Sequence, residues 1–250
     1  MASAKDIVVK PITAQAANAL VKRVHYSGKV VPNSQLHFGV YLNGRLEGAM
    51  QFGPPMKKRA MIGLVSDTTW NGFIELNRMA FSERLPRNSE SRAIAIAMKL
   101  IRNHYPSIEW AISFADGTQC GDGAIYRASG FCLTGIKRNS EIRINPRDGK
   151  PMATMAAYHK GYAKEISNWQ PLVGYQFRYI YFLNPDARQR LTVPILPFSK
   201  IDEMGASMYK GESIKRDTKA TTSDQLVGGG AIPTITLHSP YAASKKTNEA

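Results

Sequence analysis

A carboxylate and a guanidinium stand where they could act on a bound substrate. Asp116 comes just past a predicted strand, the position at which open α/β sheets present ligand crevices. Its carboxylate could orient or deprotonate an amino group or ligate a metal, although Asp116-Gly117 is also turn chemistry. Arg78 lies inside a predicted strand, where an unpaired charge is costly to bury. In a cleft it would clamp a phosphate or carboxylate, with Glu75 as its ion-pair partner, whereas on an edge strand it would face solvent.

Five further residues carry reactive groups. Tyr126, in a short predicted helix, offers either a phenol that acts as an acid, if its surroundings tune its pKa, or a ring that packs on the sheet. His25-Tyr26 ends the first predicted helix, and imidazole is a natural base or metal ligand. Ser91 could cap a helix and contact a phosphate through its hydroxyl. Cys120 could be a nucleophile, but no histidine stands at a recognisable spacing from it.

The apolar periodicity predicts the elements that must position these residues. Thr13 is a good cap for a helix that runs to about Val24, and Asn43-Gly44 is a strong hairpin turn signal. A polar loop at 84–91 opens a second helix, and 124–129 forms a third. Strands are predicted at 36–42, 46–52, 73–81, 109–114 and 176–183, with others starting at Val8 and Phe131. This order favours an α/β (α+β) layer architecture with a central mixed sheet flanked by helices.

Composition divides the chain at about residue 205. Residues 1–204 hold the periodic apolar pattern and are predicted to form one catalytic domain. Residues 205–250 are polar, with glycines at 228–230 and a lysine-bearing end. We expect this segment to be a largely unstructured tail.

The net charge indicates a polyanionic partner. The chain has 33 Lys+Arg against 19 Asp+Glu, a net charge of +14 and a pI near 9.8. Such a field raises encounter rates with polyanions and supports salt-sensitive phosphate contacts, although solubility or attraction to a ribosome or membrane surface would also explain it. The residues that we assign to nucleic-acid binding are Lys57, Lys58, Arg59, Lys137, Arg138, Arg143, Arg147 and Arg178.

The last predicted strand is unusually aromatic. Aromatic side chains occupy every second position, at Tyr175, Phe177, Tyr179 and Tyr181. One face of the strand is therefore either a core face, or a surface that stacks a base or inserts where a base was extruded.

Composition also excludes several classes of protein. A hydrophobic content of 43% excludes wholesale disorder. No window approaches the ~18 apolar residues of a membrane span, and the first residues lack the apolar run of a signal peptide. Cys120 and Cys132 are not in a metal-ligand spacing. We expect a cytoplasmic protein with no membrane partner, and the sequence leaves its oligomeric state, including a homodimer, open.

The segment from Phe73 to Phe131 resembles the core of the GNAT acetyltransferase superfamily. A strand leads to a basic, phosphate-sized loop at a helix N-terminus, and a further strand and helix follow. That helix ends in Tyr126-Arg127-Ala128-Ser129-Gly130-Phe131, which is similar to the tyrosine-x-x-x-glycine-phenylalanine motif of the superfamily. The resemblance implies a GNAT-like fold, with Tyr126 as the acid that protonates a leaving group. It also places cofactor binding at Arg87, Ser89, Ser91 and Arg92.

A finer resemblance covers roughly residues 8–185 and is to the Mom family of phage DNA-modification proteins. The similar stretches are His25-Tyr26, Glu75-Leu76-Asn77-Arg78, 89–92, and 113–117 with Tyr126. Mom proteins convert adenine to N6-carbamoylmethyladenine and so protect phage DNA from host restriction. The resemblance implies a transferase that acts on a flipped adenine of double-stranded DNA. It further implies the catalytic residues Tyr126, Asp116, Arg78, Tyr26 and His25, and an iron ion held by His25, Tyr26 and Asp116.

One departure from the GNAT pattern concerns the acyl donor. GNAT enzymes hold the coenzyme A pyrophosphate on a loop whose glycines let the backbone approach the phosphate. The corresponding string here, Arg87-Asn88-Ser89-Glu90-Ser91-Arg92, lacks both glycines and adds a negative charge at Glu90. The donor is therefore either acyl-coenzyme A, held by serine hydroxyls and arginines, or an activated glycine on a tRNA or thioester. A tRNA would also suit the net charge of +14.

Other functions predict different features. A conventional GNAT N-acyltransferase that acts on a small molecule or protein is disfavoured by the charge and the missing glycines. A non-enzymatic DNA-binding protein would need no cleft residues. A DNA methyltransferase would show an Asp/Asn-Pro-Pro-aromatic tetrapeptide, which neither Asn184-Pro185-Asp186 nor Gly53-Pro54-Pro55-Met56 satisfies.

Overall fold

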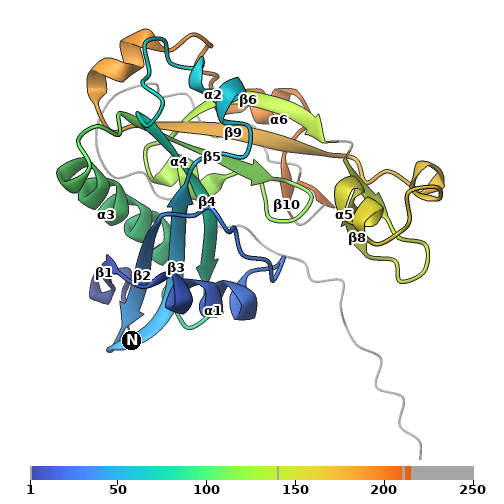
Figure 1. Cartoon of the computed structure of the whole chain (residues 1–250), viewed down its shortest axis with the longest axis horizontal. Helices are drawn as coiled ribbons and strands as arrows, with labels where there is room; N and C mark the ends of the chain where they lie inside the picture. The colour runs from blue at the N-terminus through green and yellow to red at the C-terminus, as the bar shows by residue number, and fades with distance from the viewer. Residues whose placement is uncertain (1, 140, 210–211, 215–250) are drawn as a thin grey trace, which may run out of the picture. The chain divides into compact units, whose positions relative to one another are not determined.

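The computed structural model describes residues 2–139, 141–209 and 212–214 (Figure 1). A seven-stranded sheet dominates them, in the order β1-β2-β3-β4-β5-β9-β6. Its strands are β1 Val8–Pro11, β2 Leu36–Leu42, β3 Arg45–Gly53, β4 Phe73–Phe81, β5 Trp110–Asp116, β9 Gly174–Phe182 and β6 Cys132–Asn139. Only β4 and β5 pair in parallel; the other neighbours in this sheet are antiparallel. The predicted mixed sheet is thus confirmed.

Local signals placed the first half of the sheet correctly. The β2–β3 hairpin turns at Asn43 and Gly44, whose φ angles of 50° and 77° lie in the left-handed region that Asn and Gly tolerate. The first helix, α1 Ala14–Val24, begins after Thr13, whose side chain accepts a hydrogen bond from the Ala16 amide at 3.2 Å. Both were predicted from the sequence.

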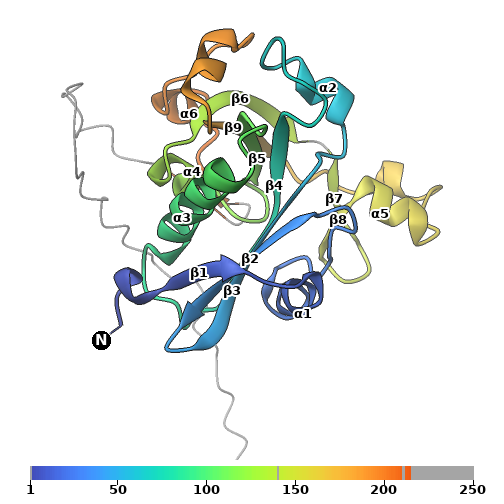
Figure 2. The same ribbon diagram turned by 60° about the vertical axis from the view of Figure 1, so that its left-hand side comes forward.

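Helices cover both faces of the sheet (Figure 2). On one face, Ala17 and Leu20 of α1 pack against Ala49 of β3. The neighbouring residues of β3, Met50 and Phe52, point to the other face and share a core with α3 Ser89–His104 and α4 Ala124–Ala128. The order β4-α3-β5-α4-β6 is the one expected for residues 73–131.

The aromatic strand β9 forms part of the core. Phe177 and Tyr179 are fully buried, and Tyr179 donates a hydrogen bond to the Asp122 carbonyl. The close approach of the Tyr179 ring leaves no room for a side chain at Gly123, where a Cβ would lie 2.4 Å from it. The alternative that this aromatic face stacks or replaces a base is wrong, because helices and neighbouring strands enclose it.

Several short elements were not predicted. α2 Lys58–Ile62 follows β3, and between β6 and β9 lie β7 Ile142–Ile144, β8 Pro151–Ala153, α5 Thr154–His159 and the 3-10 helix η2 Ile166–Asn168. The segment from β7 to η2 has a small core of its own around Ala157, Ile166 and Trp169. After β9 come the 3-10 helix η3 Pro185–Arg190, α6 Ser199–Glu203, β10 Met208–Tyr209 and β11 Glu212–Ser213, and a 3-10 helix η1 Ala4–Asp6 precedes β1.

The chain divides into two units, Met1–Arg216 and Asp217–Ala250, and the second lies outside the described residues. The tail expected at 205–250 therefore falls mostly outside them. Within the described part, Ala206, Ser207 and Met208 are buried. The division at residue 204 stays a prediction.

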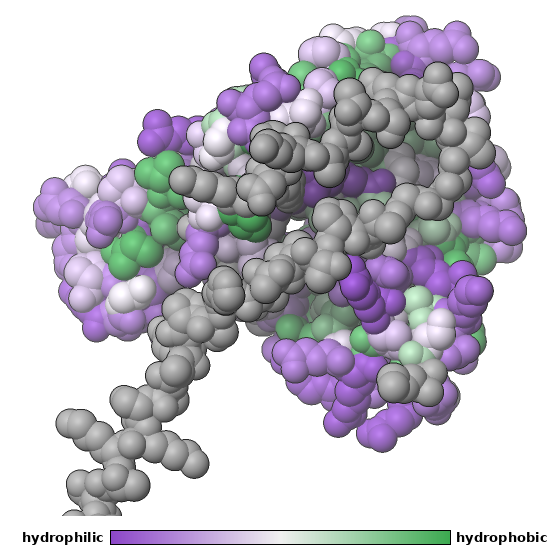
Figure 3. Space-filling model, turned by 180° about the vertical axis from the view of Figure 1, so that it is seen from behind, coloured by the Kyte–Doolittle hydropathy of each residue, from purple (hydrophilic) through white to green (hydrophobic). Residues whose placement is uncertain are grey.

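Hydrophilic residues dominate the surface seen in Figure 3, and the hydrophobic ones form small separate areas. Within the described ranges, no helix combines the length and the apolar character needed to cross a bilayer.

Candidate functional site

The sheet opens where β4 and β5 separate. Their parallel pairing runs from Phe73↔Trp110 to Glu75↔Ile112 and ends there. Beyond that point β4 stays paired with β3, and β5 with β9. Ser113 reaches across the gap and donates a hydrogen bond to the Leu76 carbonyl at 3.3 Å. Polar side chains of both strands are therefore presented at this opening.

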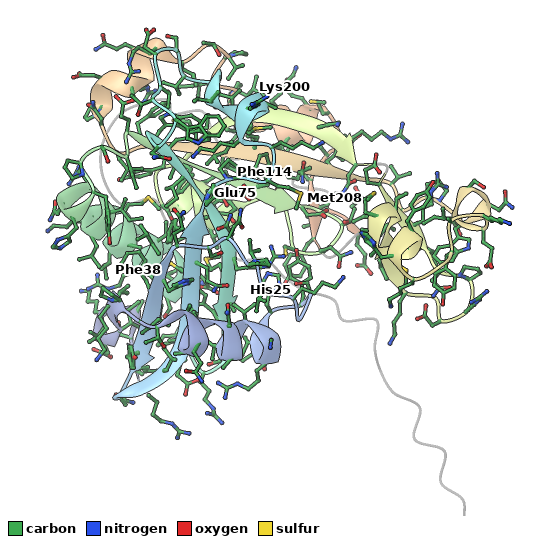
Figure 4. All side chains as sticks on the ribbon, in the orientation of Figure 1. His25, Phe38, Glu75, Phe114, Lys200 and Met208 are labelled. Carbon is green, nitrogen blue, oxygen red and sulfur yellow. The ribbon has the colours of Figure 1, made fainter. Side chains whose placement is uncertain are left out.

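A cavity of 540 Å³ lies over it, on the sheet face opposite α3. This volume is within the roughly 300–1,000 Å³ of ligand sites. Glu75 of β4 and Phe114 of β5 lie next to each other in its wall (Figure 4). The other lining residues are Pro55, Met56, Lys57, Met61, Gly135, Ile136, Lys137, Gln176 and Arg178.

Glu75 was predicted only as the ion-pair partner of Arg78, but the structure places it in the wall of the cavity. Burial raises the pKa of its carboxyl from 4.5 to about 7, against the smaller opposing effects of Arg78 and a hydrogen bond with Asn77. The expected ion pair with Arg78 is not among those of the described residues. Arg78 instead donates to the carbonyls of Lys29 at 3.0 Å and Asn77 at 2.8 Å. The sequence feature that could have indicated this role is a carboxylate between Ile74 and Leu76 in a predicted strand.

His25 and Tyr26 reach the opening from the end of α1. Burial, and then the Arg78 charge, lowers the pKa of His25 to about 4, so the imidazole is neutral at pH 7. Its Nδ1 accepts a hydrogen bond from the Ser27 amide at 3.1 Å, and we therefore assign the proton to Nε2. Tyr26 is 59% exposed, yet desolvation around its hydroxyl, followed by Cys120 and Asp116, raises its pKa.

Asp116 has the turn role that was one of its two predicted alternatives, and its role in chemistry stays a prediction. It is the last residue of β5, and its Oδ1 accepts hydrogen bonds from the Thr118 amide at 3.0 Å and the Thr118 hydroxyl at 2.5 Å. It therefore does form a turn, as its alternative predicted. The carboxylate is half-buried, and its negative charge contributes to the raised pKa of Tyr26. Asp116 therefore lies on the same side of the opening as Tyr26.

Tyr126 lies beneath the opening, on the α3 side of the sheet. Its buried hydroxyl is 2.9 Å from Ser113 Oγ. Burial raises its pKa to about 12, and the nearby Cys120 and Glu75 act in the same direction. The phenol is therefore protonated at neutral pH.

The four residues assigned to the cofactor lie at the N-terminus of α3. Arg87 and Arg92 are exposed, whereas Ser89 is fully buried and its hydroxyl has no hydrogen-bond partner among the described residues. The prediction that Ser91 caps the helix is wrong, because α3 begins at Ser89 after Asn88 and the Ser91 hydroxyl donates to the Asn88 carbonyl at 3.2 Å. Asn88 has φ 70°, so the loop makes a left-handed turn without glycine.

The structure separates the basic residues into two groups. Lys57, Lys137 and Arg178 line the cavity, and Arg59 and Arg138 are exposed. The others make contacts within the protein, as Arg178 also does with Thr134. Lys58 donates to Asn71 and lies over Trp70, Arg143 donates to the carbonyls of Ser167 and Trp169, and Arg147 pairs with Glu165. These internal partners compete with contacts to nucleic acid, and the predicted role of these residues stays a prediction.

The expected iron site is not supported. Among residues 2–139, 141–209 and 212–214, no group of three or more His, Cys, Asp or Glu side chains is placed to hold a metal. The contacts of His25, Tyr26 and Asp116 do not support such an ion either. The lone pair of His25 Nδ1 is already used by Ser27, Asp116 Oδ1 by Thr118, and the Arg78 cation acts on the imidazole.

Known proteins resemble this chain at two levels. The structure of the Escherichia coli ribosomal-protein-S18-alanine N-acetyltransferase aligns with 71% of this chain, over 94% of the enzyme's own length. The TM-score is 0.43 and the sequence identity 11%. The structure of a Bacillus subtilis acetyltransferase in complex with CoA aligns with 70% of this chain, over 97% of that acetyltransferase's length. The TM-score is 0.42 and the sequence identity 10%.

Sequence similarity is much closer. A protein of Escherichia phage Mu named methylcarbamoylase mom is 38% identical over 200 residues, which cover 76% of this chain and 81% of that protein. The Mom protein family matches residues 6–200, which include every element from β1 to η3. The chain belongs to the Mom protein family.

Proposed function

We propose that this chain is a transferase that converts adenine in double-stranded DNA to N6-carbamoylmethyladenine. The observation that carries the proposal is the cavity at the separation of β4 and β5. There the Glu75 carboxyl, with a pKa of about 7, lines the same cavity as cationic side chains of β6, β9 and the 54–57 segment. The name of the phage Mu relative, methylcarbamoylase, supports the same reaction.

The reaction needs a base for the N6 amino group and an acid for the leaving group. Glu75 suits the first role, because a base works best when its pKa lies near the working pH and Glu75 faces the cavity. Tyr126 is the candidate for the second, because its phenol keeps its proton at neutral pH and its hydroxyl lies 2.9 Å from Ser113 Oγ at the opening. Asp116, Tyr26, Arg78 and His25 would orient the reacting groups, with the Nε2–H of His25 as a donor.

Expression of the chain should place carbamoylmethyl groups on a fraction of plasmid adenines. N6 projects into the major groove, so added bulk should also block restriction enzymes that contact it. Mass spectrometry of nucleosides from a plasmid co-expressed with the chain measures the first effect, and digestion of the same plasmid the second. A plasmid from cells with the empty vector is the control. Nucleosides that contain only unmodified or methylated adenine would contradict the proposal.

The donor that fits the product best is an activated glycine. Glycyl transfer leaves N6–CO–CH2–NH2, which has the same atoms as the product N6–CH2–CO–NH2 in a different order, whereas acetyl transfer leaves one nitrogen too few. A rearrangement after acyl transfer would therefore complete the reaction without another reactant. The first turn of α3, with the exposed Arg87 and Arg92, suits a donor phosphate, whether on a tRNA or on coenzyme A.

Glycine carrying two ¹³C atoms and ¹⁵N should deliver all three labels to the modified adenine. Cells that express the chain are fed the labelled glycine, and the mass of the modified nucleoside is compared with that of unmodified adenosine from the same digest. Unmodified adenosine corrects for label that enters through purine synthesis. Excess ¹³C without excess ¹⁵N would point to an acyl-coenzyme A donor, and no excess label would exclude the glycyl route.

A further inference from the structure

An exposed methionine stands at the rim of the cavity. Met56 has 94% of its surface exposed and yet is one of the residues that line the cavity. A large apolar side chain that is exposed adds none of the stability it would gain from burial, so the exposure of Met56 points to a role outside folding. The aromatic face of β9 cannot take that role, because Phe177 and Tyr179 are in the core and Tyr175 and Tyr181 pack against it.

The segment that carries Met56 is held firmly. Gly53, the last residue of β3, pairs with Glu75 across the β3–β4 ladder. A Cβ at Gly53 would lie 2.6 Å from the Asn33 carbonyl, so the chain needs glycine there. Asn33 also donates a side-chain hydrogen bond to the Pro54 carbonyl at 3.2 Å, and Pro55 is buried. Met56 thus follows an anchored segment, three residues beyond the partner of Glu75.

The surroundings of Met56 are basic. Lys57 and Arg59 follow it and are exposed, and Lys137 and Arg178 lie in the wall of the same cavity. Of these, Arg178 is fixed by hydrogen bonds to Thr134, with Nε 3.1 Å from the hydroxyl and Nη2 2.7 Å from the carbonyl. An apolar tip among cations is complementary to duplex DNA, in which phosphates surround an apolar stack of bases.

We propose that Met56 is a wedge that enters the base stack of duplex DNA and fills the space left when an adenine moves into the cavity. Apolar side chains, methionine included, serve this purpose in proteins that unstack DNA. The inference rests on the proposed function, because N6 of a stacked adenine cannot reach the Glu75 carboxyl. Displacement of a base loses its stacking and pairing, which an inserted side chain helps to offset.

Permanganate footprinting tests this proposal on the full-length protein. Permanganate oxidises thymines that have lost their partner, so a linear DNA fragment that contains many sequence contexts reveals displaced adenines through the opposite strand. The wild-type protein should make particular thymines reactive, and Met56→Ala should lower their reactivity about tenfold. Met56→Leu should retain it, because the apolar volume is kept. Met155→Ala is the matched control, since Met155 is 64% exposed on α5 and does not line the cavity.

A second measurement separates the wedge from a contact inside the cavity. Met56→Ala should bind a duplex with an unpaired bubble as tightly as the wild type does, while it binds the paired duplex more weakly. Equal losses on both duplexes, or equal permanganate patterns for Met56→Ala and the wild type, would overturn the wedge. If the wild type exposes thymines but produces no modified adenine, the wedge stands and the proposed function fails.

Discussion

Replacement of Glu75 by glutamine should lower the rate of adenine modification by about 100-fold, the lower range of a lost general base. With a pKa of about 7, Glu75 is half deprotonated at neutral pH. The wild-type rate should therefore rise with pH up to about 7 and then level off. The residual rate of Glu75→Gln should lack this rise. Single-turnover rates of adenine modification on unmodified plasmid DNA between pH 5.5 and 8.5 measure both effects.

The same substitution, Glu75→Gln, should raise the stability of the protein although it lowers the rate. The pKa of Glu75 is raised from 4.5 to about 7, so the folded chain binds a proton more tightly than the unfolded chain in this window. The free energy of unfolding therefore falls as pH rises from 4.5 through 7, and the wild type carries the full penalty of a buried charge above pH 7. Glu75→Gln lacks that penalty. We expect it to melt above the wild type at pH 8, with a smaller difference at pH 5.

A matched control distinguishes chemistry from structure. Glu83→Gln makes the same exchange at an exposed position outside the cavity and should change neither the rate nor its pH dependence. If Glu75→Gln keeps the wild-type rate and the same rise with pH, Glu75 is not the base. A melting temperature that falls together with the rate would instead assign Glu75 a structural role.

Reversal of charge at Lys57, Lys137 and Arg138 should weaken duplex binding on the order of 100-fold at about 0.1 M salt. All three side chains are exposed, and Lys57 and Lys137 line the cavity. Each phosphate contact contributes about 0.9 to the slope of log K against log salt, so the slope should become shallower by roughly 2.7. Fluorescence anisotropy at several salt concentrations measures it. Arg143 is left unchanged, because its bonds to Ser167 and Trp169 support the segment that contains β7 and η2.

The control variant carries glutamate at Lys5, Lys99 and Arg102, which makes the same change in net charge. These cations are exposed, and Lys99 and Arg102 belong to α3, on the sheet face opposite the cavity. The control should lose little affinity if DNA is bound over the cavity. Equal losses in the two variants would mean that only total charge matters, and unchanged affinity in the first variant would refute the cavity as the DNA-binding face.

Local sequence signals determined a large part of the sheet and its helices. β4 has the predicted bounds, Phe73–Phe81, and the β2–β3 hairpin turns at the predicted Asn43-Gly44. Strand periodicity and turn residues act over a few neighbours along the chain, so the sequence alone reveals them. The family was evident for the same reason, because its motifs are short contiguous strings such as Glu75-Leu76-Asn77-Arg78.

Short elements without strong periodicity escaped prediction. α2 has five residues and β7 and β8 have three each. Elements of this length are stabilised by tertiary packing rather than by propensity, as Trp169 and Ile166 illustrate around α5. The start of α3 was also displaced, because Asn88 adopts a left-handed conformation that its residue type permits but does not impose.

The sequence by itself determined which reactive residues the chain has and which elements carry them, but only the tertiary structure decided their environment. Residues 25–26 and 116–120 meet because α1 ends beside the opening between β4 and β5, a contact that no local pattern encodes. The pKa of Glu75 depends on burial by segments that are distant in the sequence. Packing of distant segments also decided that Arg178 lines the cavity whereas Arg143 bonds to the Trp169 carbonyl. Burial and charge interactions act through space, whereas periodicity acts along the chain.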